Sequence, residues 1–396
     1  MIILVTLLLL TFFQARAGVT EIATGSMLGP RYESDRFYMR VARRGDWKQT
    51  YAERRFRGQA RGKLMMVRTA QGVFDDERSR PPAFDPERNT ERLIEALDVY
   101  KEHGVLAVSV SLQGADPGYN DPARELVSGG GTQGEENYPV VSAFRADGSL
   151  KPEWMSRLER LLSEADRRNM VVCLIYFDSR QDHTLESPEA LVAAARNITD
   201  WLIEKDFRNV VIDVADEWDL KEEFTWNLFN FVPENIARLV EEVRERFHDA
   251  DFTLPIGAST SGTMTYPASL AQTCDVVLIH GDGNSPQEKI SRIQALIQAP
   301  RPVWMVEDTN GKEITEQNLA REQSSLKTVF QSTAGWGYMP WRQAEQFPFE
   351  YLPGPGSEFN DQTPEGQREG AYFRAVLESI ARLVLKKPPS TVPKKR

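Results

Sequence analysis

Cysteine and histidine are both scarce in this chain. Two of the 396 residues are cysteines and four are histidines. Two cysteines exclude a fold held together by a disulfide framework, and because both lie in apolar segments we expect buried free thiols. The histidines never occur as H-x-H or H-E-x-x-H, which argues against a metal site built from histidine. We therefore expect no metal and no cofactor.

Basic residues are outnumbered as well. Lys and Arg total 48 against 58 Asp and Glu, which gives a net charge of −10 at pH 7. An acidic chain lacks the basic surface that nucleic-acid binding requires, so we expect no nucleic-acid partner. Hydrophobic residues make up 41% of the chain, which excludes a disordered protein and suffices for one large core or two ordinary ones.

Long apolar runs are confined to the N-terminus. Residues 2–13 are apolar and are followed by the A-x-A ending Ala15-Arg16-Ala17. This pattern is typical of a signal peptide over residues 1–17, cleaved after Ala17, and predicts a secreted or periplasmic protein. The run is shorter than the roughly 20 residues that a membrane span needs, so we expect none. Because no Lys or Arg precedes it, an uncleaved anchor or a wrongly assigned start is an alternative.

Two further segments lack the pattern of a core. Residues 18–62 show no clear period, and we expect a lead-in that packs on the main domain. Residues 386–396 carry five positive charges and three prolines without a single acidic residue, which predicts a disordered basic tail.

From residue 63 onward, short apolar runs alternate with amphipathic helical patterns. The runs have the length and continuity of strands buried on both faces. They fall at 63–72, 105–114, 170–179, 209–218, 253–260, 274–283, 302–311 and 335–342. The helical patterns fall at 86–103, 152–168, 191–205, 233–247, 286–298, 315–333 and 370–385. Only a short crossover follows the fifth run.

Eight strands in this rhythm predict an α/β fold, namely a (β/α)8 TIM barrel over residues 63–385. The rival architecture is an open doubly wound sheet. Such a sheet usually carries a glycine-rich phosphate turn after its first strand, and residues 70–75 contain no such turn.

In a TIM barrel the active site lies at the carboxyl ends of the strands. Glu217 ends the fourth predicted strand and Glu307 the seventh. A carboxylate at the end of a buried apolar strand costs free energy, so a purely structural role does not explain it well. Two carboxylates about 5–5.5 Å apart are the machinery of retaining glycoside hydrolysis, so this pair points to that chemistry.

These glutamates, together with the segments FRADGSLKPEWMSRLERLL, NVVIDVADEWD, HGDG and GWGYMPW, resemble clan A glycoside hydrolases, in particular glycoside hydrolase family 5. The resemblance spans roughly residues 63–385. It implies a bacterial secreted enzyme that cleaves β-linked polysaccharides or oligosaccharides by double displacement. Glu217 would be the acid/base and Glu307 the nucleophile.

The resemblance also implies substrate-binding residues. His280 matches the position on the sixth strand that orients nucleophile or substrate, and Trp341 matches the aromatic platform on the eighth. Further candidates around the mouth are Trp218, Tyr176 and Gln113. The family usually places Asn before its acid/base, whereas this chain has Asp216, which when ionised can only accept hydrogen bonds. Its charge would also favour the protonated form of Glu217.

Two other functions stay open at this point. Asp216 is the best argument for a catalytically impaired carbohydrate-binding protein on the same barrel. A metal-assisted hydrolase could instead use acidic residues at the strand ends, namely Asp178, Asp216, Asp282 and Asp308, although the scarcity of histidine counts against it.

Some details lie at or beyond the limit of sequence patterns. Arg68 and Asp213 sit in the middle of the first and fourth strands, and we expect them to form a buried ion pair. The loops at 115–140 and 343–368, which would define the sugar and its linkage, follow no period. The oligomeric state is likewise unpredicted.

Overall fold

The computed structural model describes residues 19–42, 63–75, 84–114, 141–178, 181–220, 228, 230–297, 300–309, 313–332, 334–345, 349–357 and 360–385. The expected signal peptide at 1–17, the expected basic tail at 386–396 and the loop at 115–140 lie outside these residues. In the described part, no helix combines the length and the apolar character that crossing a membrane would take.

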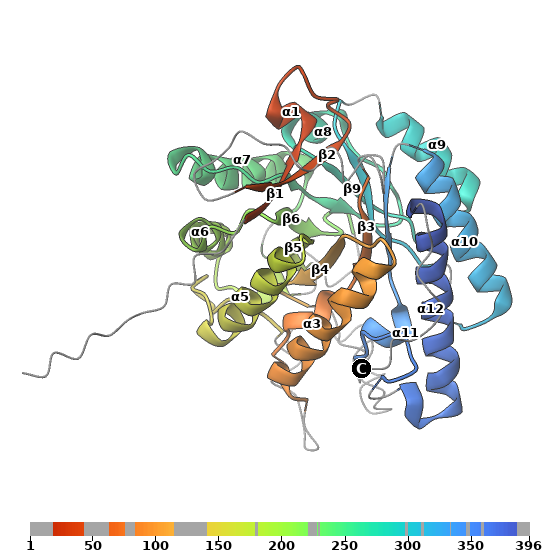
Figure 1. Cartoon of the computed structure of the whole chain (residues 1–396). Helices are drawn as coiled ribbons and strands as arrows, with labels where there is room; N and C mark the ends of the chain where they lie inside the picture. Colours follow the sequence, from red (N-terminus) through yellow and green to blue (C-terminus); the bar gives the residue numbers. More distant parts are fainter. Residues whose placement is uncertain are drawn as a thin grey trace, which may run out of the picture.

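The centre of the molecule is a sheet of parallel strands that closes on itself (Figure 1). Its strands are β3 (Met65–Arg68), β4 (Ala107–Ser111), β5 (Val171–Asp178), β6 (Val210–Asp216), β7 (Ile256–Gly257), β8 (Ser259–Thr260), β9 (Val277–His280), β10 (Val303–Glu307) and β11 (Gly335–Tyr338). β7 pairs with β6, and β8 pairs with β9. Because Ala258 alone separates β7 from β8, the two complete the ring, and the predicted (β/α)8 barrel is confirmed.

The fifth predicted strand differs from the expectation because it is broken in two. Pro255 directly precedes β7 and has no N–H to donate to a ladder. A side chain at Gly257 would meet the carbonyl oxygen of Val276 at 2.7 Å and the Leu278 side chain at 2.9 Å. The chain therefore passes this point in a crowded conformation, and only short stretches of ladder form on each side of it.

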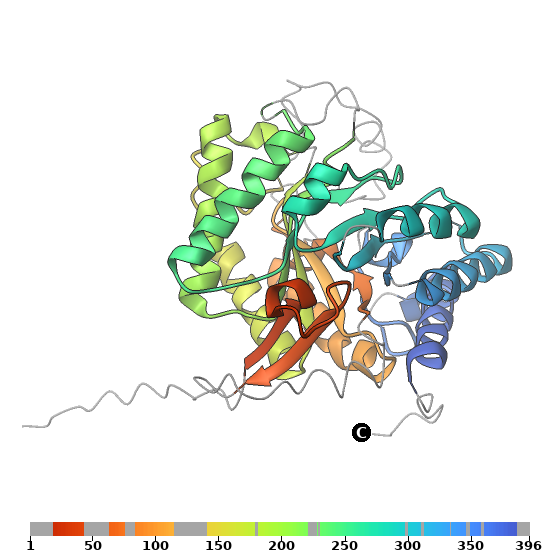
Figure 2. The same ribbon diagram turned by 90° about the horizontal axis from the view of Figure 1, so that it is seen from above.

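Helices surround the strands on the outside (Figures 1 and 2). The longer ones are α3 (Pro86–Glu102), α5 (Pro152–Arg167), α6 (Pro188–Lys205), α7 (Pro233–Asp249), α9 (Pro286–Leu296), α10 (Glu316–Gln331) and α12 (Pro364–Val384). Shorter ones are α1 (Gly25–Leu28), α8 (Ala268–Thr273), α11 (Trp341–Ala344), η1 (Ala70–Val73), η2 (Asp182–Thr184) and η3 (Asn360–Gln362).

Six of the longer helices start with proline, which suits the first helical turn because its N–H would have no partner there. This explains why α6 and α12 begin earlier than their apolar pattern predicts. Ser187 and Thr363 accept backbone N–H groups at these two starts and fix the boundary before the apolar stripe begins.

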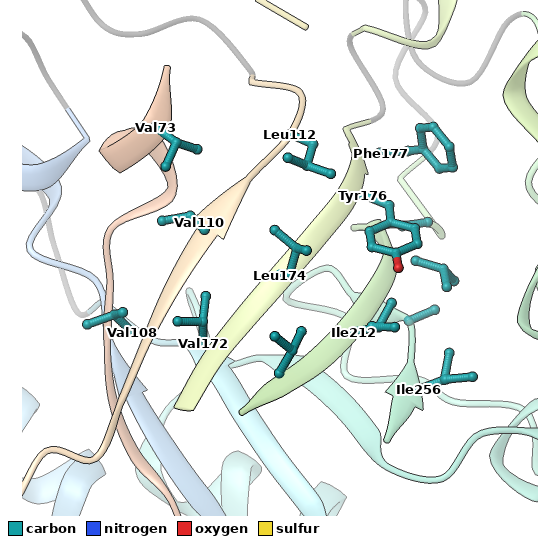
Figure 3. Close-up of a cluster of buried hydrophobic side chains, with 14 of the residues drawn as sticks. Val73, Val108, Val110, Leu112, Val172, Leu174, Tyr176, Phe177, Ile212 and Ile256 are labelled. Carbon is teal, nitrogen blue, oxygen red and sulfur yellow. The ribbon is translucent and has the colours of Figure 1, made fainter. Parts of the chain in front are cut away.

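Alternate residues of the strands pack in two different layers. Val108, Val110 and Leu112 on the β4 side and Val172 and Leu174 on β5 belong to the core beneath the helices (Figure 3). The residues between them face the inside of the barrel, where a second apolar cluster forms. This period of two decides which side chains of a strand can reach the barrel mouth.

The amino ends of the barrel strands are covered by a hairpin. It consists of β1 (Val19–Thr24) and β2 (Phe37–Ala42), which pair antiparallel and are red in Figures 1 and 2. Ile22 and Phe37 join the inner cluster with Met66 and Trp304. The N–H of Ile22 donates to the carbonyl of Arg208, just before β6, at 3.0 Å. The opposite, carboxyl ends of the strands are left for the site.

Truncating Ile22 tests whether this hairpin stabilises the barrel. Ile22→Ala removes a fully buried side chain and should lower the free energy of unfolding by about 2–4 kcal/mol. The exposed Glu204→Ala on α6 serves as the control, with an expected change below about 0.5 kcal/mol. Urea unfolding measures both, and equal effects of the two substitutions would contradict the packing described above.

Candidate active site

Among the barrel strands that end in ionisable residues, four bring these residues together at one mouth. Arg68, Asp216, His280 and Glu307 are the last residues of β3, β6, β9 and β10. Carboxyl ends of parallel strands lie at the same end of a closed barrel. Glu217 follows Asp216 and joins them. The site is thus built on strand ends that the hydrogen-bonded ring holds in place.

Glu217 and Glu307 are brought together around His280. Nδ1 of His280 lies 3.2 Å from Oε1 of Glu217 and 3.6 Å from Oε2 of Glu307. One oxygen of each glutamate and one ring nitrogen all lie within 4.8 Å of one another. A bulge between Met305 and Glu307 sets Glu307 beside His280 in the ladder. The two residues that sequence reasoning named as catalytic therefore share one site.

Glu217 has an unusual backbone. Its φ of 50° is in the left-handed region, which costs a non-glycine residue on the order of 1–3 kcal/mol. Its N–H points to the Ser259 hydroxyl at 3.4 Å, and its carbonyl accepts the N–H of Leu220 at 2.9 Å. Strain of this kind persists where the surroundings over-determine a functional geometry.

Arg68 is the central cation of the site. Its Nη2 lies 2.7 Å from Oδ2 of Asp216, and its Nε lies 2.8 Å from Oε2 of Glu307. A third carboxyl group, Glu345, stands 4.0 Å from the same Nε. Arg68 is 8% exposed, so these interactions are little screened by water.

The expected ion pair between Arg68 and Asp213 is wrong. Arg68 lies in the ladder opposite Ser109, at a level below Asp213, and its long side chain extends past that level to the strand ends. Asp213 instead accepts the N–H of Ser259 at 2.9 Å. Burial, and then the charge of Asp216, raise the pKa of Asp213 to about 7.

Asp216 is held by protein groups rather than left for a substrate. Burial alone would raise the pKa of Asp216, but Arg68 and His280 hold it well below the usual range. Its Oδ1 also accepts the Ser259 hydroxyl at 3.1 Å. The extra charge next to Glu217 is therefore balanced by two cations.

His280 is the second cation. It is fully buried, which would lower its pKa, but Glu307, Asp216 and Glu217 raise the pKa of His280 well above its ordinary value. A protonated ring donates hydrogen bonds and has no lone pair for a metal. Although Glu217, His280 and Glu307 have the spacing of a metal site, the imidazolium and Arg68 do not fit a bound cation.

Glu307 is ionised in this environment. Burial would raise the pKa of Glu307, but Arg68, His280 and a hydrogen bond from Asp282 lower it. Its side chain is 10% exposed, against 23% for Glu217. The two glutamates thus differ in surroundings, as separate roles for a nucleophile and a proton donor require.

Behind Glu307 lies a buried ion pair on the helix side. Nζ of Lys289, on α9, is 2.6 Å from Oδ1 of Asp308, and both side chains are fully buried. The indole N–H of Trp336 donates to the other oxygen of Asp308 at 2.7 Å. Asp308 is committed to these partners, so its role is to anchor the chain directly after the candidate nucleophile.

The three aromatic candidates differ in their exposure to solvent. Trp341 starts α11 and is partly exposed; the N–H of neighbouring Met339 donates to the carbonyl of Asp308 at 3.0 Å, which keeps this segment at the mouth. Trp218 is 4% exposed and packs edge-on against Tyr266. Tyr176 is fully buried in the helix-facing core (Figure 3).

The structure does not bring Tyr176 or Gln113 to the site. The hydroxyl of Tyr176 lies 3.2 Å from that of Thr199 on α6, because even-numbered residues of β5 face the helices. Nε2 of Gln113 contacts Ser142 and two groups after β5, while its Oε1 accepts the N–H of Asp178 at 3.3 Å. Gln113 ties two loops together instead of facing a substrate.

Sequence reasoning missed Glu345. It follows α11, and Nε2 of Gln71 donates to its Oε2. Burial, and to a lesser extent Glu307 and Asp216, raise the pKa of Glu345 to about 8 against the lowering effect of Arg68. No periodic pattern marks this segment; the one available signal is that Glu345 is the first acidic residue after the last predicted strand.

Comparisons with known proteins locate the fold. No family model matches the chain, and no curated protein matches it. Its structure is similar to a glycoside hydrolase family 5 enzyme from Prevotella bryantii B14, with a TM-score of 0.51 and 9% identity over 80% of this chain and 95% of that one. The expected resemblance in fold to clan A glycoside hydrolases is thus confirmed, and at this identity the likeness shows the fold alone.

Two longer proteins are also similar. One is a candidate glycoside hydrolase from Bacteroides vulgatus ATCC 8482, and the other is an exo-β-1,4-mannosidase from Opitutaceae bacterium strain TAV5. Each has a TM-score of 0.49 and 12% identity over 82% of this chain. The chain spans 55% and 60% of their lengths, respectively.

Glu345→Gln tests whether the buried carboxyl group of Glu345 is neutral in the folded protein. The folded carboxyl keeps its proton up to about pH 8, whereas the unfolded one releases it near 4.5, so its contribution lowers stability as pH rises between these values. The slope is at most about 1.4 kcal/mol per pH unit. Glu345→Gln should flatten the pH dependence of urea unfolding.

The exposed Glu204→Gln is the matched control and should follow the wild type. If Glu345→Gln and wild type lost stability in parallel from pH 5 to 8, Glu345 would be ionised throughout.

Proposed function

We propose that this protein is a secreted retaining glycoside hydrolase that cleaves β-linked polysaccharides or oligosaccharides. The observation that carries the proposal is the meeting of Glu217 and Glu307, whose oxygens lie within 4.8 Å of each other in unequal surroundings. A short separation suits direct attack by one carboxylate; an inverting enzyme needs about 6.5–9.5 Å to admit a water. The fold, and the activities printed for similar structures, agree with this class.

In the first step, Glu307 attacks the anomeric carbon while Glu217 gives its proton to the departing glycosidic oxygen. The C–O bond to the leaving group breaks, and an ester between Glu307 and the sugar forms. In the second step, Glu217 removes a proton from water, the water oxygen attacks the same carbon, and Glu307 leaves as a carboxylate. Protons and charges balance over the two steps.

The surrounding residues divide the work between the two glutamates. Arg68 and the His280 ring stabilise the ionised form of Glu307. Nδ1–H of His280 donates to one oxygen of Glu217, at 3.2 Å, which leaves the other oxygen to carry the proton. Trp341 at the mouth supplies a partly exposed ring on which a sugar can stack. The apolar run at residues 2–13 supports export, which is part of the proposal.

A second candidate is a carbohydrate-binding protein without turnover. The argument for it is Asp216, which stands where family 5 enzymes usually have an asparagine before the acid/base. The oxygens of Asp216 are taken by Arg68 and Ser259 and are not free for a sugar hydroxyl, so the usual role of that position in turnover is not filled. The metal-assisted alternative has less support. Asp308 is bound to Lys289 and Asp216 to Arg68, and among the described residues the one group with metal-ligand spacing is a different set.

Glutamine substitutions at the two glutamates test the proposal. Glu217→Gln and Glu307→Gln should each lower kcat by about 10³-fold or more on a responsive polysaccharide, while the circular dichroism spectrum of each variant stays that of the folded wild type. On an aryl glycoside with a good leaving group, Glu217→Gln should lose less, because that group departs without a proton.

Asp219→Asn is the matched control. Asp219 lies two residues after Glu217 but bonds Ser261 and Thr263, so turnover should stay of the same order. Wild-type rates in both glutamine variants would refute the enzymatic proposal. Sugar binding without product release in the wild type would favour the binding protein.

A further inference from the structure

Asp282 lies beside the candidate nucleophile and has no role in the mechanism above. It follows β9 by two residues, and its side chain is hydrogen-bonded to that of Glu307. Its Oδ1 accepts the N–H of Thr309 at 2.6 Å. The backbones on either side are also tied, because the N–H of Gly281 donates to the carbonyl of Glu307 at 2.7 Å. Asp282 is thus held in place beside Glu307.

Two carboxyl groups can form a hydrogen bond with each other only if one of them carries a proton, because an ionised carboxylate is an acceptor alone. The surroundings decide which one does. Arg68 lies 2.8 Å from Glu307, and the next oxygen-to-nitrogen distance, to His280, is 3.6 Å. Burial, then Glu307 and Asp308, raise the pKa of Asp282 well above its ordinary value, against the weaker effect of His280.

We propose that Asp282 is a positioning residue that donates a hydrogen bond, as a neutral carboxylic acid, to the carboxylate of Glu307. This inference rests on the proposed function, in which Glu307 is the nucleophile. The donated bond stabilises the ionised carboxylate of Glu307 and fixes its orientation at the mouth. An ionised Asp282 could accept the N–H of Thr309 equally well. The proton on Asp282 therefore distinguishes the proposed role from a purely structural one.

The proton stays on Asp282 throughout the reaction, so no further acid or base is needed. Hydrogen bonds to an ionised acceptor are stronger than those to a neutral one. The bond is therefore strongest when Glu307 is free and weakest when Glu307 is esterified to the sugar. It favours departure of Glu307 in the second step and keeps the carboxylate aimed before the first.

The pair Asp282→Asn and Asp282→Ala tests this role in the full chain. The amide of Asn can donate to Glu307 and still accept from Thr309, so kcat should stay within about threefold of wild type. Alanine removes the donor, and kcat should fall about 10²-fold, the scale of losing one preorganised donor. KM should change little in either variant.

The acid limb of the pH profile of kcat/KM distinguishes a positioning role of Asp282 from a role in packing alone. Without the donor the pKa of Glu307 rises, so in Asp282→Ala this limb should move to higher pH, and in Asp282→Asn it should not. An Asp282→Asn variant as impaired as Asp282→Ala, or an unmoved limb in Asp282→Ala, would overturn the inference.

Unfolding measurements test the proton without any substrate. A buried acid that keeps its proton in the folded state makes stability fall as pH rises above the unfolded value. Asp282→Asn should therefore lose less unfolding free energy than wild type between pH 5 and 8, while the exposed Glu204→Gln should match wild type. Equal losses in Asp282→Asn and wild type would contradict a neutral Asp282.

The two proposals can fail separately. Absence of hydrolysis by the wild type, with the unfolding result as expected, would reject the proposed function and leave the protonated Asp282 standing. Hydrolysis by the wild type with a disabled Asp282→Asn variant would reject the role of Asp282 alone.

Discussion

The guanidinium of Arg68 joins the two halves of the site across the barrel. It contacts Asp216 on β6 and Glu307 on β10 at 2.7 and 2.8 Å, although β3 pairs with neither strand. Both acids are about nine-tenths buried, so removing their shared partner would leave uncompensated charge at a cost of about 3–5 kcal/mol. Glu217 directly follows Asp216, so holding Asp216 and Glu307 with one cation also keeps Glu217 close to Glu307.

The remaining charges follow from that arrangement. Arg68 and His280 are positive, and Asp216 and Glu307 are negative, so the buried part of the site is balanced. Burial favours the neutral forms of two further acids in the same region, because it raises the pKa of Asp213 to about 7 and that of Glu345 to about 8. Glu217 is the more exposed of the two glutamates, at 23% against 10% for Glu307.

The sequence predicts the barrel, and the meeting of Glu217 and Glu307 at its mouth, because both depend on local patterns. Buried strands are continuous apolar runs, and an acid that ends such a run lies at the mouth of a closed barrel. What it cannot predict is the direction and reach of single side chains. Tyr176 fails because its position on β5 faces the helices, and Arg68 bypasses Asp213 because its side chain spans more than one level of the ladder.

Long-range partners explain the other differences. Gln113 looks like a mouth residue, yet its amide is used by loops 29 to 71 positions away in the chain. Glu345 joins Arg68 from a segment with no period, and its contact with Gln71 spans 274 positions. Such contacts depend on the closed fold and leave no mark in local spacing.

The central claim is that Glu307 attacks the sugar and Glu217 supplies the proton. The most direct test is mass spectrometry of the protein after incubation with an activated 2-deoxy-2-fluoro glycoside, which slows release of a covalent intermediate. The account predicts one added glycosyl group, mapped by proteolysis to the peptide that contains Glu307. A substrate turned over with inversion of the anomeric centre, or a glycosyl group found on Glu217, would contradict it.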